Sequence, residues 1–153
     1  MCSSDLLSTT GALTRLNVRG DMTATIGAAA GISSLVVAGN VNGAMVLAGA
    51  NLGSDGQVGG ADAAADTYGA GALSTIKVSG MVSNSLFGAG LDPVNGVFLD
   101  SDDRVIGVAD SVMRKVTVKG GIDNASRFVA GAFGPVRAPG PVDVTTDPRF
   151  KVL

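Results

Sequence analysis

The sequence predicts an all-β protein, most simply a parallel β-helix or solenoid of short strands with about 20 residues per rung. Three observations support this class: a recurring sequence pattern, alternation of apolar residues within it, and a composition suited to strands and turns. The 153 residues provide enough chain for one domain with a sizeable core. An antiparallel β-sandwich is the alternative, because it also has short strands at regular spacing.

The recurring pattern is Φ-x-x-Φ-x-Φ-x-Gly-x-Φ, where Φ is an apolar residue. Its four copies begin at Leu13, Ile32, Leu73 and Met113. Their shared glycines are Gly20, Gly39, Gly80 and Gly120, so the first spacing is about half of each of the two that follow. The unit is therefore about 20 residues long, or a doubled unit of about 40 residues that contains two turns.

Within each copy the apolar residues alternate, as Leu16 and Val18 do, which indicates a strand with one buried face. Ala-Gly steps at 48–49, 89–90 and 130–131 recur at one constant interval and suit tight corners. A rung cannot bury its apolar face alone, so its stability comes from its neighbours. An isolated stack leaves strands unpaired at its ends, and we expect it to be marginally stable or to associate end to end.

The composition favours strands and turns over helices. Glycine occurs 23 times, hydrophobic residues make up 46% of the chain, aromatic residues make up only 4%, and Glu is absent. Residues 22–54 carry no charge, but Asn40, Asn42, Asn51 and several glycines interrupt them, so we expect no transmembrane segment. The net charge of −2 gives no argument for a nucleic-acid partner.

Three segments follow from these patterns. Residues 1–6 read as the translated end of a common sequencing adapter that starts at GTG, so we expect a scar there, which leaves Cys2 uninformative. Residues 7–140 carry the repeats. Residues 141–153 contain Pro141 and Pro148 and are expected to form a tail or a linker.

The repeated Leu/Ile-x-x-Leu/Ile-x-Val-x-Gly blocks, together with residues 85–96, resemble the β-strand-repeat regions of large bacterial surface proteins, including autotransporter-type passengers. The resemblance covers residues 11–140. It implies a secreted or cell-surface location and a non-catalytic structural or adhesive role, such as a rigid rod or an adhesin stalk. The implied partners are neighbouring repeats of a longer parent chain, a glycan or another surface protein.

Acidic residues form the first candidate site. They lie between the repeats, and the predicted ligands of a Ca²⁺ ion are Asp62, Asp100, Asp102 and Asp103. Ca²⁺ takes several carboxylate and carbonyl oxygens from flexible loops. However, the spacing is not that of an EF-hand, and Asp is also common in solvated turns, where it accepts bonds from backbone N–H groups. No other cofactor is predicted.

Basic residues form the second candidate, an outer face that attracts acidic glycans or anionic headgroups. These residues occupy outward positions of the repeats: Arg15, Arg19, Lys77, Lys115 and Lys119. Val36 and Ala38 interrupt this face in the second repeat. The alternative is an ordinary solvated strand surface on which Lys discourages edge pairing.

Catalysis is not expected. The chain has no His, so it cannot form a Ser-His-Asp or Cys-His arrangement by itself. It also has no Trp for sugar stacking, and Tyr68 is its one tyrosine. A carbohydrate-active β-helix remains the distant alternative, and it requires two Asp carboxyls that face each other across a groove.

Overall fold

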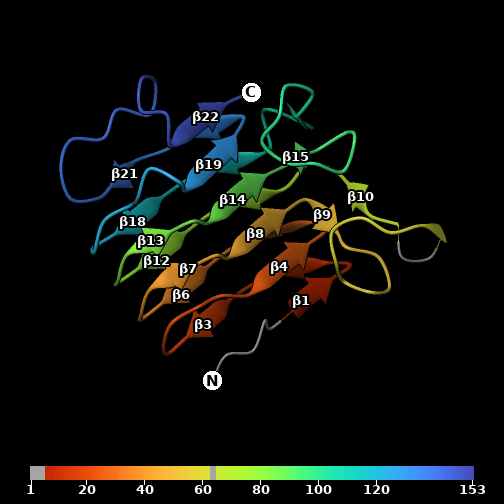
Figure 1. The fold of residues 1–153 in the computed structure, drawn as a ribbon, viewed down its shortest axis with the longest axis horizontal. Helices are drawn as coiled ribbons and strands as arrows, with labels where there is room; N and C mark the ends of the chain where they lie inside the picture. Colours follow the sequence, from red (N-terminus) through yellow and green to blue (C-terminus); the bar gives the residue numbers. More distant parts are fainter. Residues whose placement is uncertain (1–5, 63–64) are drawn as a thin grey trace.

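The computed structural model describes residues 6–62 and 65–153. It confirms the all-β class and consists of short strands in parallel sheets (Figure 1). Antiparallel pairing is confined to two short strand pairs within this described part, whereas a sandwich of the alternative type would be antiparallel throughout. Among the described residues, no helix is long and apolar enough to cross a membrane.

Sheet 1 is the longest and has six parallel strands. In spatial order these strands are β1 (Leu6–Thr9), β4 (Thr25–Ala28), β8 (Met45–Ala48), β14 (Leu86–Ala89), β19 (Arg127–Ala130) and β22 (Phe150–Val152). The spatial order equals the order in the sequence, so each strand is added to the edge left by the one before it (Figure 1).

Sheets 2 and 3 repeat this order with shorter parallel strands. Sheet 2 contains β2 (Ala12–Leu13), β5 (Gly31–Ile32), β11 (Ala72–Leu73), β17 (Val112–Met113) and β20 (Ala132–Phe133). Sheet 3 contains β3 (Leu16–Val18), β6 (Leu35–Val37), β12 (Ile76–Val78), β18 (Val116–Val118) and β21 (Val136–Arg137). A further parallel pair, β7 (Val41–Asn42) and β13 (Val82–Ser83), lies between sheets 3 and 1 in the sequence.

The chain visits sheets 1, 2 and 3 in the same order five times, and we call each passage a circuit. The strand registers place Leu6 beside Thr25, Thr25 beside Met45, Met45 beside Leu86, and Leu86 beside Arg127. The first two circuits therefore have close to the predicted length of one rung. The next two are roughly twice as long yet contain one passage each, so the expectation of two turns per doubled unit is wrong.

Two excursions account for the extra length of these circuits. The first, residues 51–69, and the second, residues 91–110, leave sheet 1 and return to sheet 2. Each is closed at its base by an antiparallel pair. In the first excursion β9 (Ala50–Asn51) pairs with β10 (Thr67–Tyr68), and in the second β15 (Leu91–Asp92) pairs with β16 (Arg104–Val105).

Two of the three Ala-Gly steps stand where the excursions begin, and the third, at 130–131, leads directly from β19 to β20. Gly49 has a φ of 89°, and its carbonyl accepts a hydrogen bond of 2.7 Å from the Gly69 N–H. A Cβ at Gly49 would overlap the Gly69 carbonyl. Gly90, with a φ of 64°, receives the Ile106 N–H in the same way. Both positions need a residue without a side chain and with a left-handed backbone.

Inside the circuits, equivalent apolar residues stack into ladders. One ladder crosses sheet 1 from Leu7 through Ile26, Val46, Phe87 and Phe128 to Phe150. The Phe87 and Phe128 rings stack at 4.6 Å between centroids with 2° between planes, and Phe128 stacks on Phe150 at 5.0 Å. Parallel pairing without register shift lets identical side chains pack on each other along the stack.

The outer face of sheet 1 is also buried, because the excursions pack against it. A second apolar cluster joins this face to the excursions: Leu47, Ala50, Leu52, Leu86, Leu91, Val105 and Val129. Gly27 lies under Leu52, where an added Cβ would come within 2.7 Å of the leucine Cγ. The central strands of sheet 1 are thus covered on both faces.

Strands lie close to both ends of the described chain. Residues 1–5, including Cys2, lie outside the described residues, but Leu6 is the first residue of β1 and its side chain reaches Gly56. Phe150–Val152, expected in a tail, form the sixth strand of sheet 1. Pro139, Pro141 and Pro148 all lie outside strands, so they do not interrupt backbone pairing.

Candidate functional site

Three of the predicted acidic ligands come together in the second excursion. Asp100, Asp102 and Asp103 each place a carboxylate oxygen so that the three atoms lie within 4.8 Å of one another. Asp102 is exposed, and the other two residues are partly buried. The group comes from one short stretch of a single loop, rather than from opposite sides of a groove.

Short side-chain-to-backbone bonds shape this loop. Val94 N–H donates to Asp92 Oδ1 at 3.0 Å, Val97 N–H to Asn95 Oδ1 at 2.7 Å, and Asp102 N–H to Asp100 Oδ1 at 3.2 Å. In each of these turns, the side-chain oxygen of an Asp or Asn accepts a hydrogen bond from the backbone N–H two residues later. This is the usual role of Asp and Asn in loops. At the base of the loop, Arg104 pairs with the buried Asp92 at 2.7 Å.

The three carboxyl groups differ in their pKa values. Burial raises the pKa of Asp103, although it accepts the Leu99 N–H at 2.6 Å. The hydrogen bond between the Asp100 and Asp102 side chains lowers the pKa of Asp100 and raises that of Asp102. Asp103 Oδ1 is buried and has no hydrogen-bond partner. A cation bound by this group would satisfy that oxygen.

The fourth predicted ligand, Asp62, is not a member of this group. It is exposed in the first excursion, with a left-handed φ of 55°. The stacking that the repeat predicted does not bring it to Asp103, because each excursion folds as a separate loop closed by its own antiparallel pair.

A contact that the sequence did not reveal joins the two excursions. Tyr68 meets Phe98 edge to face, with 6.1 Å between ring centroids. The Tyr68 hydroxyl donates to Asp66 Oδ2 at 2.7 Å, and that oxygen also accepts the Gly59 N–H. Burial, followed by this bond to Asp66, raises the pKa of Tyr68 well above its ordinary value. Asp66 therefore closes the loop through Oδ2, whereas its Oδ1 is buried without a hydrogen-bond partner, as Asp103 Oδ1 is.

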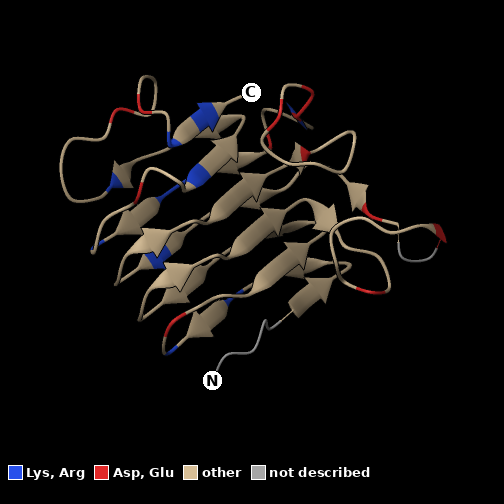
Figure 2. Ribbon diagram, viewed as in Figure 1, with Lys and Arg blue, Asp and Glu red and all other residues tan. Residues whose placement is uncertain are grey.

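The predicted basic residues are all exposed, but they do not form a continuous stripe (Figure 2). In sheet 3, Lys77 lies between Val36 and Thr117 of the neighbouring strands. Arg15 and Lys115 occupy equivalent positions of different circuits, and Ser34 and Thr75 separate them. The interruption by Val36 that the repeat predicted is therefore seen in the sheet, and Thr117, Ser34 and Thr75 separate the cations further.

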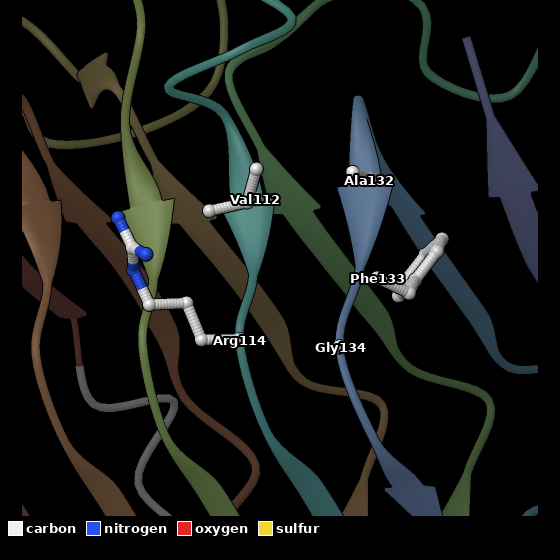
Figure 3. Close-up of a pocket in the computed structure, with 5 residues that line it drawn as sticks. All are labelled: Val112, Arg114, Ala132, Phe133 and Gly134. Carbon is white, nitrogen blue, oxygen red and sulfur yellow. The ribbon is translucent and has the colours of Figure 1, made fainter.

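Two shallow pockets lie away from the acidic group. One, of about 320 Å³, is lined by Val112, Arg114, Ala132, Phe133 and Gly134 on sheet 2 (Figure 3). In this close-up the Arg114 and Phe133 side chains point away from each other. The other pocket, of about 400 Å³, is lined by polar side chains and Met81.

The polar pocket owes its shape to side chains that stack between circuits. Asp21 accepts the Asn40 N–H at 2.7 Å, and Asn40 in turn accepts the Met81 N–H at 2.9 Å. These residues satisfy backbone groups at the corner between sheets 3 and 1. The need to satisfy these backbone groups therefore explains why polar side chains line this pocket.

The chain was compared with protein-family models, with curated proteins and with solved structures, and none of the three comparisons gives a match.

Replacing Asp103 by Asn tests the strain within the acidic group. The pKa of Asp103 is raised in the folded state, so its ionised form opposes folding above that pKa, and the penalty disappears as the pH falls below about 3.8. In chelator, D103N should unfold at higher urea concentration than the unmodified chain at pH 7, with no advantage near pH 3. The exposed Asp110→Asn change is the matched control. An advantage at pH 3 equal to that at pH 7 would contradict this assignment.

Proposed function

We propose that this chain is a segment of a parallel β-helix and acts as a non-catalytic, rigid structural module of a larger protein. In this role it spaces or presents other parts of that protein, as a rod or an adhesin stalk does. Its partners are then neighbouring repeats of the same chain. The secreted or cell-surface location belongs to the same proposal and rests on the resemblance of the repeated blocks.

The observation that carries the proposal is the unbroken inner ladder from Leu7 to Phe150. It crosses all six strands of sheet 1 without a register shift. A structure built from equivalent circuits is stabilised by contacts between neighbours, so it can be lengthened without a new core. That property suits a spacer.

Rigidity has two sources in this chain. Every interior strand of sheet 1 pairs with a strand on each side, and its inner residues are almost fully buried, as Val46, Phe87 and Phe128 are at 0% exposure. The excursions then cover the outer face of the same sheet. Bending the stack would separate ring pairs and open both clusters at once.

The chemistry of the acidic group also favours a structural role over an enzymatic one. Its three carboxylates come from one short loop, and neither described pocket contains them. General acid and base catalysis of glycoside cleavage needs two carboxyl groups on opposite sides of a bound bond.

Deleting one whole circuit tests the proposal. Residue 86 pairs with residue 127, so removal of residues 86–126 joins Ser85 to Arg127 and keeps the ladders in register. We expect this variant to fold, with a β-type circular dichroism spectrum and a cooperative thermal transition, although with a lower melting temperature. The matched control carries the same deletion together with Phe128→Asp, which places a charge in the inner ladder that the shortened chain has to rebuild. It should not fold cooperatively.

An unfolded in-register variant would contradict the modular account, because it would show that the deleted circuit is irreplaceable. Equal folding of both variants would contradict it as well, because the inner ladder would then not matter. Size-exclusion chromatography with light scattering separates a folded short stack from an aggregate.

A second candidate function is calcium binding by the acidic group, which in turn organises contact with a glycan or a partner. The unpartnered buried oxygen of Asp103, next to two further carboxylates, is the observation that favours it. Hard cations select such oxygen ligands. The present loop would supply three carboxylates, and backbone carbonyls or water would complete the coordination.

A thermal melt with Ca²⁺ and then with chelator tests this candidate. Binding to the folded state alone stabilises it by about 2.7 kcal/mol at a hundredfold excess of ligand over the dissociation constant. The unmodified chain and the Asp110→Asn control should then gain melting temperature with Ca²⁺, and Asp102→Asn should lose that gain. No shift in any of the three proteins would remove calcium from the account.

A further inference from the structure

Two asparagines of the chain are followed directly by glycine. They are Asn42, which precedes Gly43, and Asn95, which precedes Gly96. In such a pair the glycine nitrogen can attack the side-chain amide carbon of the asparagine, because glycine has no Cβ in the way and its backbone reaches many conformations. The two atoms meet only when the local backbone opens. The fold therefore decides which of the two pairs reacts.

The fold holds the Asn42–Gly43 pair between neighbouring circuits. The Asn42 N–H donates to the Met22 carbonyl at 3.0 Å on one side, and the Gly43 N–H donates to the Ser83 carbonyl at 3.0 Å on the other. The next residue, Ala44, is only 2% exposed. Release of the Gly43 nitrogen therefore needs separation of two circuits, which is an opening of high free energy.

The Asn95–Gly96 pair lies in the exposed outer part of the second excursion, which follows β15 (Figure 1). Val94 and Val97, on either side of the pair, are 55% and 58% exposed. The Gly96 N–H donates to the nearby Pro93 carbonyl at 3.2 Å, and the same carbonyl also accepts the Asn95 N–H. This bond is long and shared, and its opening leaves the stacked circuits intact.

The backbone of this turn is strained. Val94 has a φ of 42°, a left-handed value that a β-branched residue rarely adopts. Such strain persists only where the surrounding structure enforces it. When the turn opens, Val94 returns to an ordinary conformation, so the strain lowers the cost of releasing the Gly96 nitrogen.

Two hydrogen bonds orient the Asn95 side chain. The Val97 N–H donates to Asn95 Oδ1 at 2.7 Å. A donor at this oxygen polarises the amide and stabilises the negative charge that develops there when the amide carbon is attacked. On the other side, Asn95 Nδ2 donates to Asp100 Oδ2 at 2.9 Å. The reacting amide thus lies directly beside the acidic group.

We propose that Asn95 is a site of spontaneous deamidation, with water as the co-reactant. The Gly96 nitrogen gives its proton to water and bonds to Asn95 Cγ, the Cγ–Nδ2 bond breaks, and Nδ2 leaves as ammonia after it takes up protons from water. Water then opens the resulting cyclic imide at either carbonyl. The product at position 95 is aspartate or isoaspartate, and the net change is the exchange of NH₂ for OH.

The product alters the acidic group. A carboxylate replaces the donor that faced Asp100, so a fourth negative charge joins those of Asp100, Asp102 and Asp103. Like charges at this distance repel and raise the pKa values of their neighbours. The modification thus weakens the turn that holds this part of the loop. The inference rests neither on the proposed role as a spacer nor on calcium binding.

The test follows both pairs in one sample. The full chain is incubated in mildly alkaline buffer with chelator, either folded or unfolded in urea, and peptide mapping by mass spectrometry measures the exchange of NH₂ for OH at each position. In the folded chain Asn95 should convert at least about tenfold faster than Asn42, because opening a loop costs less than separating circuits. In urea the two should convert at similar rates.

The matched control is Asn95→Gln, which keeps the amide but lengthens the side chain, so that ring closure is disfavoured. It should abolish the mass change at position 95 and leave the rate at Asn42 unaltered. Equal rates at Asn42 and Asn95 in the folded chain would overturn the proposal. An unchanged rate ratio in urea would do so too, because the fold would then not select the site. Conversion of Asn95→Gln as fast as the unmodified chain would exclude attack by Gly96.

Discussion

In-register stacking of equivalent apolar residues between parallel strands is the constraint on which the rest of this structure depends. Each strand of sheet 1 is only four residues long or shorter and would have no stability alone. Stability comes from contacts between neighbouring circuits. In the inner ladder Phe128 stacks on Phe87, and Phe150 stacks on Phe128. A shift of one residue would turn every inner side chain outward.

The excursions do not disturb this in-register stacking. They leave the stack at Gly49 and Gly90 and rejoin it without changing the register of the strands that follow. The chain can therefore carry a long insertion in a circuit at little cost to the core. The inserted residues cover the outer face of sheet 1 through Leu52 and Leu91, and they hold the acidic group. Regular circuits and long connecting loops thus coexist in one chain.

The sequence predicted the strands better than it predicted the excursions. Alternation and the shared glycines located the sheet 3 strands such as Ile76–Val78, because period two and a following glycine are local signals. The count of turns in a doubled unit was wrong, since spacing does not distinguish a second turn from a loop. Asp100, Asp102 and Asp103 are neighbours in the sequence and lie together in the structure, whereas Asp62 is not part of this group because each excursion closes as its own loop. No sequence pattern predicts two further contacts, the ring pair Tyr68–Phe98 and the ion pair Arg149–Asp147.

Disulfide trapping on the outer face of sheet 3 tests the central claim most directly. With Cys2 replaced by Ser, cysteines at Lys77 and Thr117 face each other across β12 and β18. Neighbouring strands are about 4.8 Å apart, which is within reach of a disulfide. The account predicts rapid intramolecular oxidation of this pair and slow oxidation of a control pair at Lys77 and Lys119, which lies out of register on the same face. Equal oxidation of both pairs, or faster oxidation of the control, would contradict the in-register parallel stack.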